Sequence, residues 1–245
     1  MQAYYHSIEE FGTVDGRGIR FVLFLAGCGL GCAFCHNPDT WERGRRQISI
    51  EQVLACYGEY KEFYQASGGG ITVSGGEPLQ QADFVAALFK ACQELGIHTT
   101  LDTSGYAPRF ALTQVLPYTE ELLFCLKASC ESKYKYLTNA GMADILKNLE
   151  YAVKLTSSTV RYVVIPDVND RPEDICALAG IMHRLPNAKL ELLPYHNLGM
   201  SKWQELGWKY KLAAVRQANS VDIERMTARL LELGVPRTAI ANLVK

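Results

Sequence analysis

The sequence has no long apolar run, no excess of charge of either sign, no internal repeat and no linker rich in Pro, Gly or Ser. A membrane-spanning helix needs roughly 20 apolar residues, and no stretch approaches that length. The 25 basic and 26 acidic residues nearly cancel, which gives no reason to expect a nucleic-acid or membrane-surface partner. The opening residues MQAYYHSIEEFG lack a basic segment followed by an apolar one, so we expect no secretory signal and a cytoplasmic protein.

Short apolar runs alternate with longer amphipathic segments along the chain. The runs are rich in Val, Ile, Leu, Thr and aromatic residues, as strands buried on both faces are. We expect strands at 20–27, 70–75, 98–105, 121–128, 159–166 and 189–196. Six strands alternating with helices indicate an α/β fold, either an open partial barrel or a doubly wound sheet, because six strands are too few for a closed eight-stranded barrel.

Helical patterns lie between these runs. The patterns predict helices at 49–64, 81–96, 143–155, 172–185 and 221–234. Ser49 and Gln52 form a possible capping box at the start of the first, and Gly234 followed by Pro236 ends the last. Cys56 and Cys92 fall inside helical patterns and are expected to be small buried side chains.

Chemistry-bearing residues follow the ends of the predicted strands, where parallel α/β folds collect function. Each residue alone is weak evidence, but together they outline one large site. They are Cys28, Gly75, Gly76, Glu77, Asp102, Thr103, Lys127 and His196, with Arg161 inside the fifth strand.

Three of the eight cysteines, Cys28, Cys32 and Cys35, crowd into one loop with the spacing Cx3Cx2C. A structural zinc site requires four ligands, usually from two CxxC pairs, and this sequence has no second pair. His36 directly follows Cys35, which is a poor spacing for the fourth ligand of a tetrahedral site. A disulfide would leave one thiol over and suits another compartment. Three thiolates on a four-iron cluster would instead leave one iron open to a small molecule.

The Cx3Cx2C loop after a first strand, with the aromatic Phe34 before its last cysteine, resembles the signature of the radical S-adenosylmethionine superfamily. SGGEPL (74–79), on the next strand, resembles that superfamily's GGE motif. The segments 12–21, 32–41, 66–81, 101–105, 161–166 and 193–203 are similar to the pyruvate formate-lyase-activating enzymes, a family of glycyl-radical activases. The chain lacks the cysteine-dense insert of many activases for other targets.

The resemblance implies a fold, cofactors and a reaction. It implies one domain over 1–245, with an open partial TIM-type (β/α)6 barrel at about 12–200 and a helical segment at about 201–245. It implies a [4Fe-4S] cluster that passes one electron to S-adenosylmethionine, giving methionine and a 5′-deoxyadenosyl radical. That radical takes a hydrogen from a glycine α-carbon of a partner enzyme, most simply pyruvate formate-lyase, and reduced flavodoxin or ferredoxin supplies the electron.

The resemblance also implies roles for individual residues. Cys28, Cys32 and Cys35 would ligate iron and thereby act in catalysis, while Gly76 and Glu77 would hold the methionyl amine. The GTVDGRGIR loop, through Asp15 and Arg17, would contact the partner enzyme. The remaining expected cofactor contacts are Phe34, His36, Asn37, Gly75, Asp102, Thr103, Lys127, Arg161 and His196.

Two departures from the family pattern bear on function. The family usually has Asp-Leu-Lys where this chain has Cys125-Leu126-Lys127, and a thiol is a poor ligand for a hard cation. The monovalent-cation site that Asp102 and Thr103 resemble is therefore in doubt. Arg17 replaces a usual Pro, which removes a fixed φ, adds a charge and could mark another partner.

Structural alternatives stand beside these roles. Gly75–Glu77 could be a tight turn, His196 a core histidine, Asp102 a turn cap, and Lys127 and Arg161 members of ion pairs. Cys125 and Cys130 could bind a metal or form a redox pair, but we expect them to be core or wall thiols. The whole chain could also activate a different glycyl-radical enzyme, act on a small molecule, or be an electron carrier or an activase relic.

Overall fold

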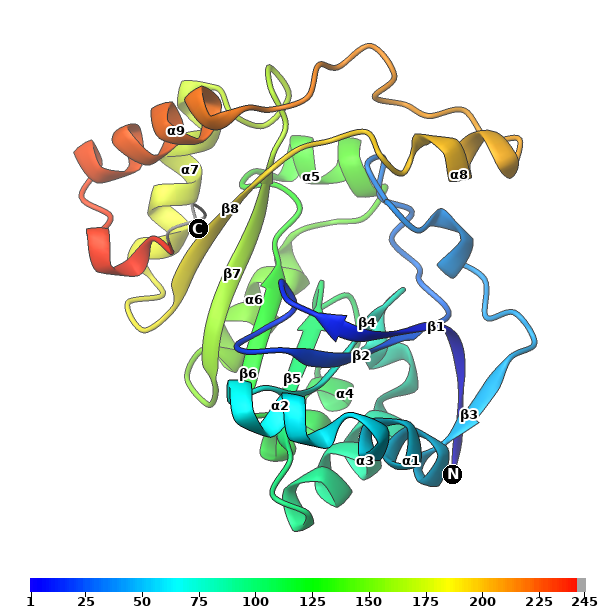
Figure 1. Cartoon of the computed structure of the whole chain (residues 1–245). Coiled ribbons are helices and arrows are strands. Elements are labelled where there is room, and N and C mark those ends of the chain that lie inside the picture. Colours follow the sequence, from blue (N-terminus) through cyan, green and yellow to red (C-terminus); the bar gives the residue numbers. More distant parts are fainter. Residues whose placement is uncertain (242–245) are drawn as a thin grey trace. The chain divides into compact units, whose positions relative to one another are not determined.

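The computed structural model describes residues 1–241 of the chain (Figure 1). Its strands are β1 (Gln2–Gly12), β2 (Arg20–Leu25), β3 (Gln47–Ser49), β4 (Gly70–Gly75), β5 (His98–Thr103), β6 (Glu121–Cys125), β7 (Ser157–Val164) and β8 (Lys189–Pro194). Their order by hydrogen-bonded neighbours is β3-β1-β2-β4-β5-β6-β7-β8. All six strands predicted from the apolar runs are present, and the predicted α/β class is confirmed.

Two strands, β1 and β3, were not predicted. β1 pairs antiparallel with β2 and with β3, and its register with β2 shifts at two places. Its sequence, QAYYHSIEEFG, has no apolar run, so its extended state comes from main-chain pairing on both sides rather than from burial of an apolar face. The pairs β2–β4, β4–β5 and β7–β8 are parallel.

The five predicted helices are present, with one difference. The helices are α1 (Ile50–Glu59), α2 (Lys61–Ser67), α3 (Ala82–Glu94), α4 (Arg109–Val115), α5 (Glu131–Thr138), α6 (Ala143–Ala152), α7 (Pro172–His183), α8 (Met200–Glu205) and α9 (Ser220–Glu232). The Ser49–Gln52 capping box is confirmed, but the first predicted helix divides at Tyr60 into α1 and α2. The short α4, α5 and α8 were not predicted because each spans only about two turns of sequence pattern.

Main-chain contacts divide the chain into two compact units. Unit 1 contains Met1–Gly29, Thr40–Leu123 and Leu155–Ser157; unit 2 contains Leu30–Asp39, Phe124–Lys154 and the described residues from Ser158 on. The division passes through β6. Compact units are not separate domains, and the single-domain organisation stays a prediction.

In unit 1, helices α1, α2 and α3 lie on one side of β2 and β4 (Figure 1). α3 buries Phe84, Val85, Leu88, Phe89 and Cys92 completely or nearly so. Cys92 is thus the expected core residue, whereas Cys56 is only half-buried. This packing holds the parallel strands of unit 1 in place.

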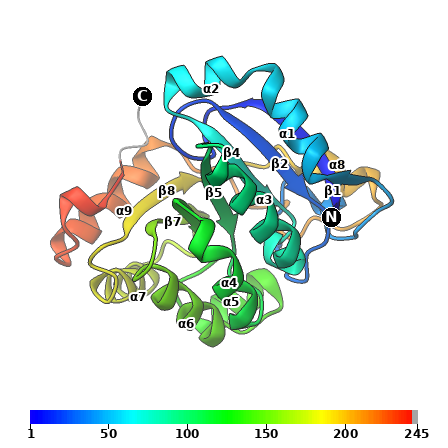
Figure 2. The ribbon, with the colours of Figure 1, turned by 90° about the horizontal axis from the view of Figure 1, so that it is seen from below.

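In unit 2, α7 and α9 pack together beside β8 (Figure 2). Leu178 of α7 and Met226 and Leu230 of α9 have no exposed surface. α9 ends before Gly234, whose φ of 85° only glycine adopts readily, as the stop signal predicted. No helix within residues 1–241 is long and apolar enough to cross a membrane.

Candidate functional site

Glu77 lies at the carboxyl end of β4 in unit 1 and is almost completely buried. The Thr103 hydroxyl and the Leu79 N–H donate to Oε1 at 2.5 and 3.1 Å. The Ser104 N–H and hydroxyl donate to Oε2 at 2.9 and 2.5 Å. A carboxylate has about four acceptor positions, so these four donors use them all. Glu77 therefore ties the end of β4 to the end of β5.

Burial and hydrogen bonding act on Glu77 in opposite directions. Loss of water around the carboxylate raises the pKa of Glu77, and the hydrogen bonds from Ser104, Thr103 and Leu79 lower it. Burial is the larger effect, and the pKa of Glu77 lies above its ordinary value. The hydrogen bonds are what make a buried carboxylate tolerable at this position.

Gly75 and Gly76 allow a close approach of the β4 end to the end of β2. A Cβ on Gly75, whose φ is 119°, would lie 2.2 Å from the Leu25 carbonyl oxygen, and one on Gly76 would lie 2.3 Å from that of Gly27. The Gly76 and Glu77 N–H groups donate to those same two carbonyls at 2.9 and 2.8 Å. The tight-turn alternative thus has direct support, because main chain occupies the space that a side chain would need.

Asp102 and Thr103 end β5 next to this turn. The Ser74 hydroxyl donates to Asp102 Oδ2 at 2.8 Å, so β4 and β5 are linked a second time. Unit 1 thereby brings together five of the predicted residues: Gly75, Gly76, Glu77, Asp102 and Thr103. Cys125, the residue that makes the cation site doubtful, ends β6 and is half-buried.

Cys28 follows β2 in a segment fixed by main-chain hydrogen bonds. The Gly27 and Cys28 N–H groups donate to the Thr40 and Trp41 carbonyls at 2.7 and 3.0 Å. Cys28 therefore belongs to unit 1 and is half-buried. The cysteine loop proper, residues 32–39, belongs to unit 2.

Cys32 and Cys35 are joined by one turn. The Cys35 N–H donates to the Cys32 carbonyl at 3.0 Å, and the Ala33 N–H between them donates to the Leu137 carbonyl at 2.7 Å. Such a turn presents two thiols from neighbouring positions, as paired metal-binding cysteines require. Cys32 is buried and Cys35 is half-buried.

His36 and His196 stack in unit 2, with ring centroids 4.1 Å apart and an interplanar angle of 29°. His36 Nε2 donates to the His196 carbonyl at 3.3 Å. Burial, followed by the neighbouring His196 and Lys127, lowers the pKa of His36, so the ring is neutral at pH 7. Lys127 Nζ lies 5.9 Å from the centre of the Phe34 ring, a long cation–π distance. Unit 2 thus groups four predicted cofactor contacts.

Asn37 and Arg161 have protein partners. Asn37 Oδ1 accepts from Lys202 Nζ at 2.8 Å. Arg161, on β7, forms an ion pair with Glu191, its registered neighbour on β8, with Nε and Oε2 2.6 Å apart. The ion-pair alternative for Arg161 therefore has support, and a charged side chain this deeply buried needs such a partner.

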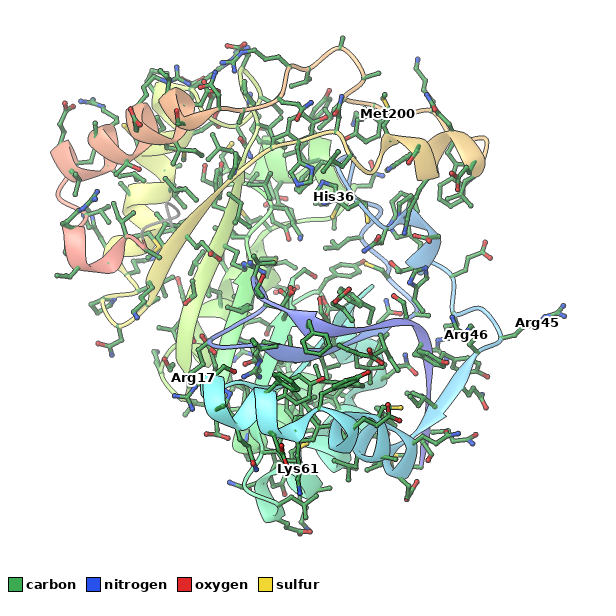
Figure 3. The ribbon with its side chains drawn as sticks, viewed as in Figure 1. Arg17, His36, Arg45, Arg46, Lys61 and Met200 are labelled. Atoms are coloured by element: carbon green, nitrogen blue, oxygen red, sulfur yellow. The ribbon has the colours of Figure 1, made fainter. Side chains whose placement is uncertain are left out.

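Asp15 and Arg17 lie elsewhere in unit 1. The Asp15 carbonyl accepts from the Thr72 hydroxyl at 2.7 Å, and the Arg17 N–H donates to Glu121 at 3.4 Å. Figure 3 shows Arg17 near α2, at the amino ends of the parallel strands. The structure does not bring these two residues to the carboxyl ends, where Glu77 and Thr103 lie.

The donor chemistry fits an iron–sulfur cluster. None of the eight cysteines, all within the described residues, forms a disulfide, and soft thiolates suit iron–sulfur clusters. His196 Nδ1 is buried and has no hydrogen-bond partner within residues 1–241, which fits a polar group of a bound ligand. No group of three or more His, Cys, Asp or Glu side chains that could hold a metal is formed in that range. The three thiol ligands therefore stay a prediction of the motif.

Sequence reasoning missed several residues of this region. Ser104 supplies two of the bonds to Glu77, and Trp203 Nε1 donates to the Cys35 carbonyl at 2.9 Å. Outside this region, at the amino end of β2, Arg20 was missed as well, and it is completely buried. All three residues lie inside segments of the family resemblance, Trp203 with Lys202 in 193–203, Ser104 in 101–105 and Arg20 in 12–21, and that resemblance was the one available signal for them.

The Radical SAM superfamily model matches residues 22–179. A pyruvate formate-lyase-activating enzyme of Listeria monocytogenes is 41% identical over 236 residues, covering 93% of this chain and 95% of the relative. A pyruvate formate-lyase 1-activating enzyme of Escherichia coli K12 is 38% identical over 234 residues, covering 94% and 95%.

Solved structures give the same fold class. A domain of a pyruvate formate-lyase-activating enzyme from Bacteroides vulgatus matches 71% of this chain and 100% of its own length, with TM-score 0.58 and 25% identity. A radical SAM methyltransferase from Sphaerobacter thermophilus matches 98% of this chain and 76% of its own, with TM-score 0.68 and 18% identity. The predicted partial-barrel fold class, with parallel strands and outer helices, is confirmed by this similarity.

Proposed function

We propose that this protein installs the glycyl radical of pyruvate formate-lyase. The chain belongs to the radical SAM superfamily and to its family of pyruvate formate-lyase-activating enzymes. The similarity to named activases over more than nine-tenths of the chain carries this proposal. The Cx3Cx2C loop adds the chemistry that the reaction needs.

Cys28, Cys32 and Cys35 are the proposed ligands of a [4Fe-4S] cluster. When bound, such a cluster supplies one electron for reductive cleavage of S-adenosylmethionine to methionine and a 5′-deoxyadenosyl radical. The turn from Cys32 to Cys35 supports their assignment because it presents two thiols from one short segment. Three protein ligands leave one iron available to the nucleotide.

The side chains around the cysteine loop have the proposed task of holding and orienting S-adenosylmethionine. His36 and Phe34 offer aromatic surfaces to the adenosine part, and Lys127 offers a cation to the carboxylate. The buried Nδ1 of His196 supports a polar contact with the same ligand. Asn37 and Arg161 remain proposed contacts, although each already has a protein partner.

On the β4 and β5 side, the proposed amine contacts are the main chain at Gly75 and Gly76, together with Glu77. The four hydrogen bonds that Glu77 accepts favour a supporting role for its carboxylate, which keeps Thr103 and Ser104 in place. Asp102 and Thr103 remain the proposed cation ligands. Cys125→Asp tests that site: we expect tighter cation and nucleotide binding, and an unchanged affinity would mean that position 125 does not touch the cation.

Partners beyond pyruvate formate-lyase belong to the same proposal. A one-electron reductant is required, and reduced flavodoxin or ferredoxin would supply it in the cytoplasm. Asp15 and Arg17 remain the proposed partner contacts. Their position at the amino ends of the strands means that such a contact would use a different part of unit 1 from Glu77.

Electron spin resonance of the anaerobically reconstituted protein tests the proposal. Candidate glycyl-radical enzymes are added one at a time with a reductant and S-adenosylmethionine. We expect a glycyl radical signal with pyruvate formate-lyase, and none with Cys32→Ala. A signal only with another lyase would show that this other enzyme is the partner. Arg17, which stands where the family usually has Pro, would then mark the change of partner. No 5′-deoxyadenosine from a fully loaded cluster would indicate a relic or an electron carrier.

A further inference from the structure

The segment that follows β8, residues 196–203, packs against the cysteine loop, and both belong to unit 2. The cysteine loop contains no helix or strand between Leu30 and Asn37. A loop without regular hydrogen bonding takes its conformation from the groups that contact it. The contacts from residues 196–203 therefore matter for how its thiols are presented.

Trp203 makes the first of these contacts. Its indole Nε1 donates to the Cys35 carbonyl at 2.9 Å, and the side chain is 6% exposed. Edge-on packing against Tyr210 and Trp208, with ring centroids 5.4 and 6.2 Å away, fixes the plane of the indole. The direction of the donated N–H is therefore set before any cluster is bound.

Lys202 makes the second contact, with residues that follow Cys35 in the loop. Its Nζ donates to Asn37 Oδ1 at 2.8 Å and lies 3.1 Å from Asp39 Oδ2. Both members of the ion pair are about one-third exposed, which makes the pair less screened than a fully solvated one. The loop is thus held at Cys35 and again two and four residues later.

Gly199 makes these contacts possible. A Cβ at position 199 would lie 2.6 Å from His36 Cα and 3.1 Å from the Cys35 carbonyl oxygen. The φ of Gly199 is −73°, which any residue can adopt, so glycine is required for space rather than for conformation. Figure 3 shows His36 and Met200, the first residue of α8, close to each other.

We propose that Lys202 and Trp203 are positioning residues for the iron-binding thiols: they hold Cys35 and the residues after it in the geometry that retains the cluster. This inference rests on the proposed function, because it needs the cluster at Cys35. It assigns a task to the Lys-Trp pair, which contacts Cys35, Asn37 and Asp39. Groups that orient metal ligands commonly change metal affinity by one to two orders of magnitude when they are lost.

Trp203→Phe and the matched control Trp208→Phe test the proposal on the reconstituted full chain. The Phe side chain at 203 keeps an aromatic ring against Tyr210 but removes the donor to Cys35 together with part of the indole volume. We expect iron to leave Trp203→Phe about tenfold faster than wild type when a ferrous chelator is added without oxygen. Trp208→Phe, which alters the same aromatic group away from Cys35, should lose iron at the wild-type rate.

Three further variants test the lysine and keep the proposal testable if Trp203→Phe fails to fold. Lys202→Met should also accelerate iron loss, Lys202→Arg should restore much of the lifetime through Asp39, and the exposed Lys209→Met should have no effect. The electron spin resonance line shape of the reduced cluster should change in Trp203→Phe and Lys202→Met alone, which a general loss of stability would not produce.

Wild-type iron lifetimes and line shapes in both Trp203→Phe and Lys202→Met would overturn the inference. Equal acceleration in the two controls would overturn it as well, since the effect would then not come from contacts with the loop. Neither measurement uses the partner enzyme. Failure of the inference with a cluster present therefore leaves the proposed function standing, whereas absence of any cluster refutes both.

Discussion

The Thr103 hydroxyl donates to Glu77 Oε1 at 2.5 Å, and both residues are at least 98% buried. They end neighbouring parallel strands of unit 1, so this bond joins β4 to β5 where the predicted cofactor residues lie. Because both groups are buried, neither can exchange the bond for water.

Thr103→Val removes this donor and keeps the shape of the side chain. We expect the free energy of unfolding to fall by about 1.5–3 kcal/mol, since the carboxylate loses one partner and cannot be resolvated. Denaturant titration measures the change. The control, Thr113→Val on α4, removes a hydroxyl that donates to the Phe110 carbonyl at an exposed position. Equal small effects in both variants would mean that Glu77 finds another donor.

Arg20 is the largest completely buried charged side chain among the described residues. It donates to the Thr72 and Thr100 hydroxyls at 2.9 and 2.8 Å and to the Ile71 carbonyl at 2.6 Å. Burial lowers the pKa of Arg20 to about 10, so the guanidinium is still charged at pH 7.

Arg20→Met should lower the free energy of unfolding by about 3–5 kcal/mol, because it strands several buried acceptors. Arg17→Met, three residues away and exposed, should change it by no more than about 0.5 kcal/mol. Thermal or denaturant unfolding of the two variants decides the matter. If Arg20→Met lowers the free energy of unfolding by less than about 1 kcal/mol, the hydrogen bonds from Arg20 to Thr72, Thr100 and Ile71 do not stabilise the fold as expected.

His98 predicts a pH dependence. Burial and the nearby Arg20 and Arg17 lower the pKa of His98 from 6.5 to about 4. The unfolded chain therefore binds a proton that the folded chain does not, and the free energy of unfolding falls as the pH falls from about 6.5 to about 4.

His98→Gln retains an acceptor for Arg20, which lies 3.0 Å from Nδ1, but cannot titrate. Between pH 7.5 and pH 5 we expect wild type to lose about 1 kcal/mol more than this variant, a value reduced because His98 is only half-buried. Denaturant titrations at the two pH values measure the difference. Parallel curves for the two proteins would show that His98 titrates normally.

Replacing glycine by alanine should change the free energy of unfolding in opposite directions at positions 199 and 180. Gly199→Ala forces a Cβ against His36 and should cost about 1–3 kcal/mol of unfolding free energy. Gly180 lies inside α7 with no atom within 4 Å of an added Cβ, so Gly180→Ala should stabilise by about 0.5–1 kcal/mol. Stabilisation by Gly199→Ala would mean that residues 196–203 do not press on the cysteine loop.

Local patterns carried most of the fold prediction. After Arg20 the β2 run is apolar, and the β4 run contains the β-branched residues Ile71, Thr72 and Val73, so the strand state of both could be read from the sequence. Ser49 with Gln52 marked the start of α1. β1 could not be read in this way, because its polar sequence becomes a strand only by pairing with β2 and β3.

Contacts between distant residues limited the site prediction. Nothing local to Trp203 indicates that it donates to a carbonyl 168 positions earlier. Arg20 is polar at the head of an apolar strand, and its burial depends on Thr72 and Thr100 from two other strands. Glu77 stays a proposed amine contact, but local pattern did not indicate its four hydrogen-bond donors, which come from its own turn and from the end of β5.

The central claim is that Cys28, Cys32 and Cys35 hold a four-iron cluster with one iron open to S-adenosylmethionine. Electron spin resonance of the reduced, reconstituted protein before and after addition of S-adenosylmethionine tests it most directly, with Cys32→Ala and the half-buried Cys56→Ala as matched variants. We predict a cluster signal in wild type and Cys56→Ala that changes when the nucleotide is added, and no such signal in Cys32→Ala. Four-coordinate zinc in place of iron, or a cluster spectrum that the nucleotide leaves unchanged, would contradict the claim.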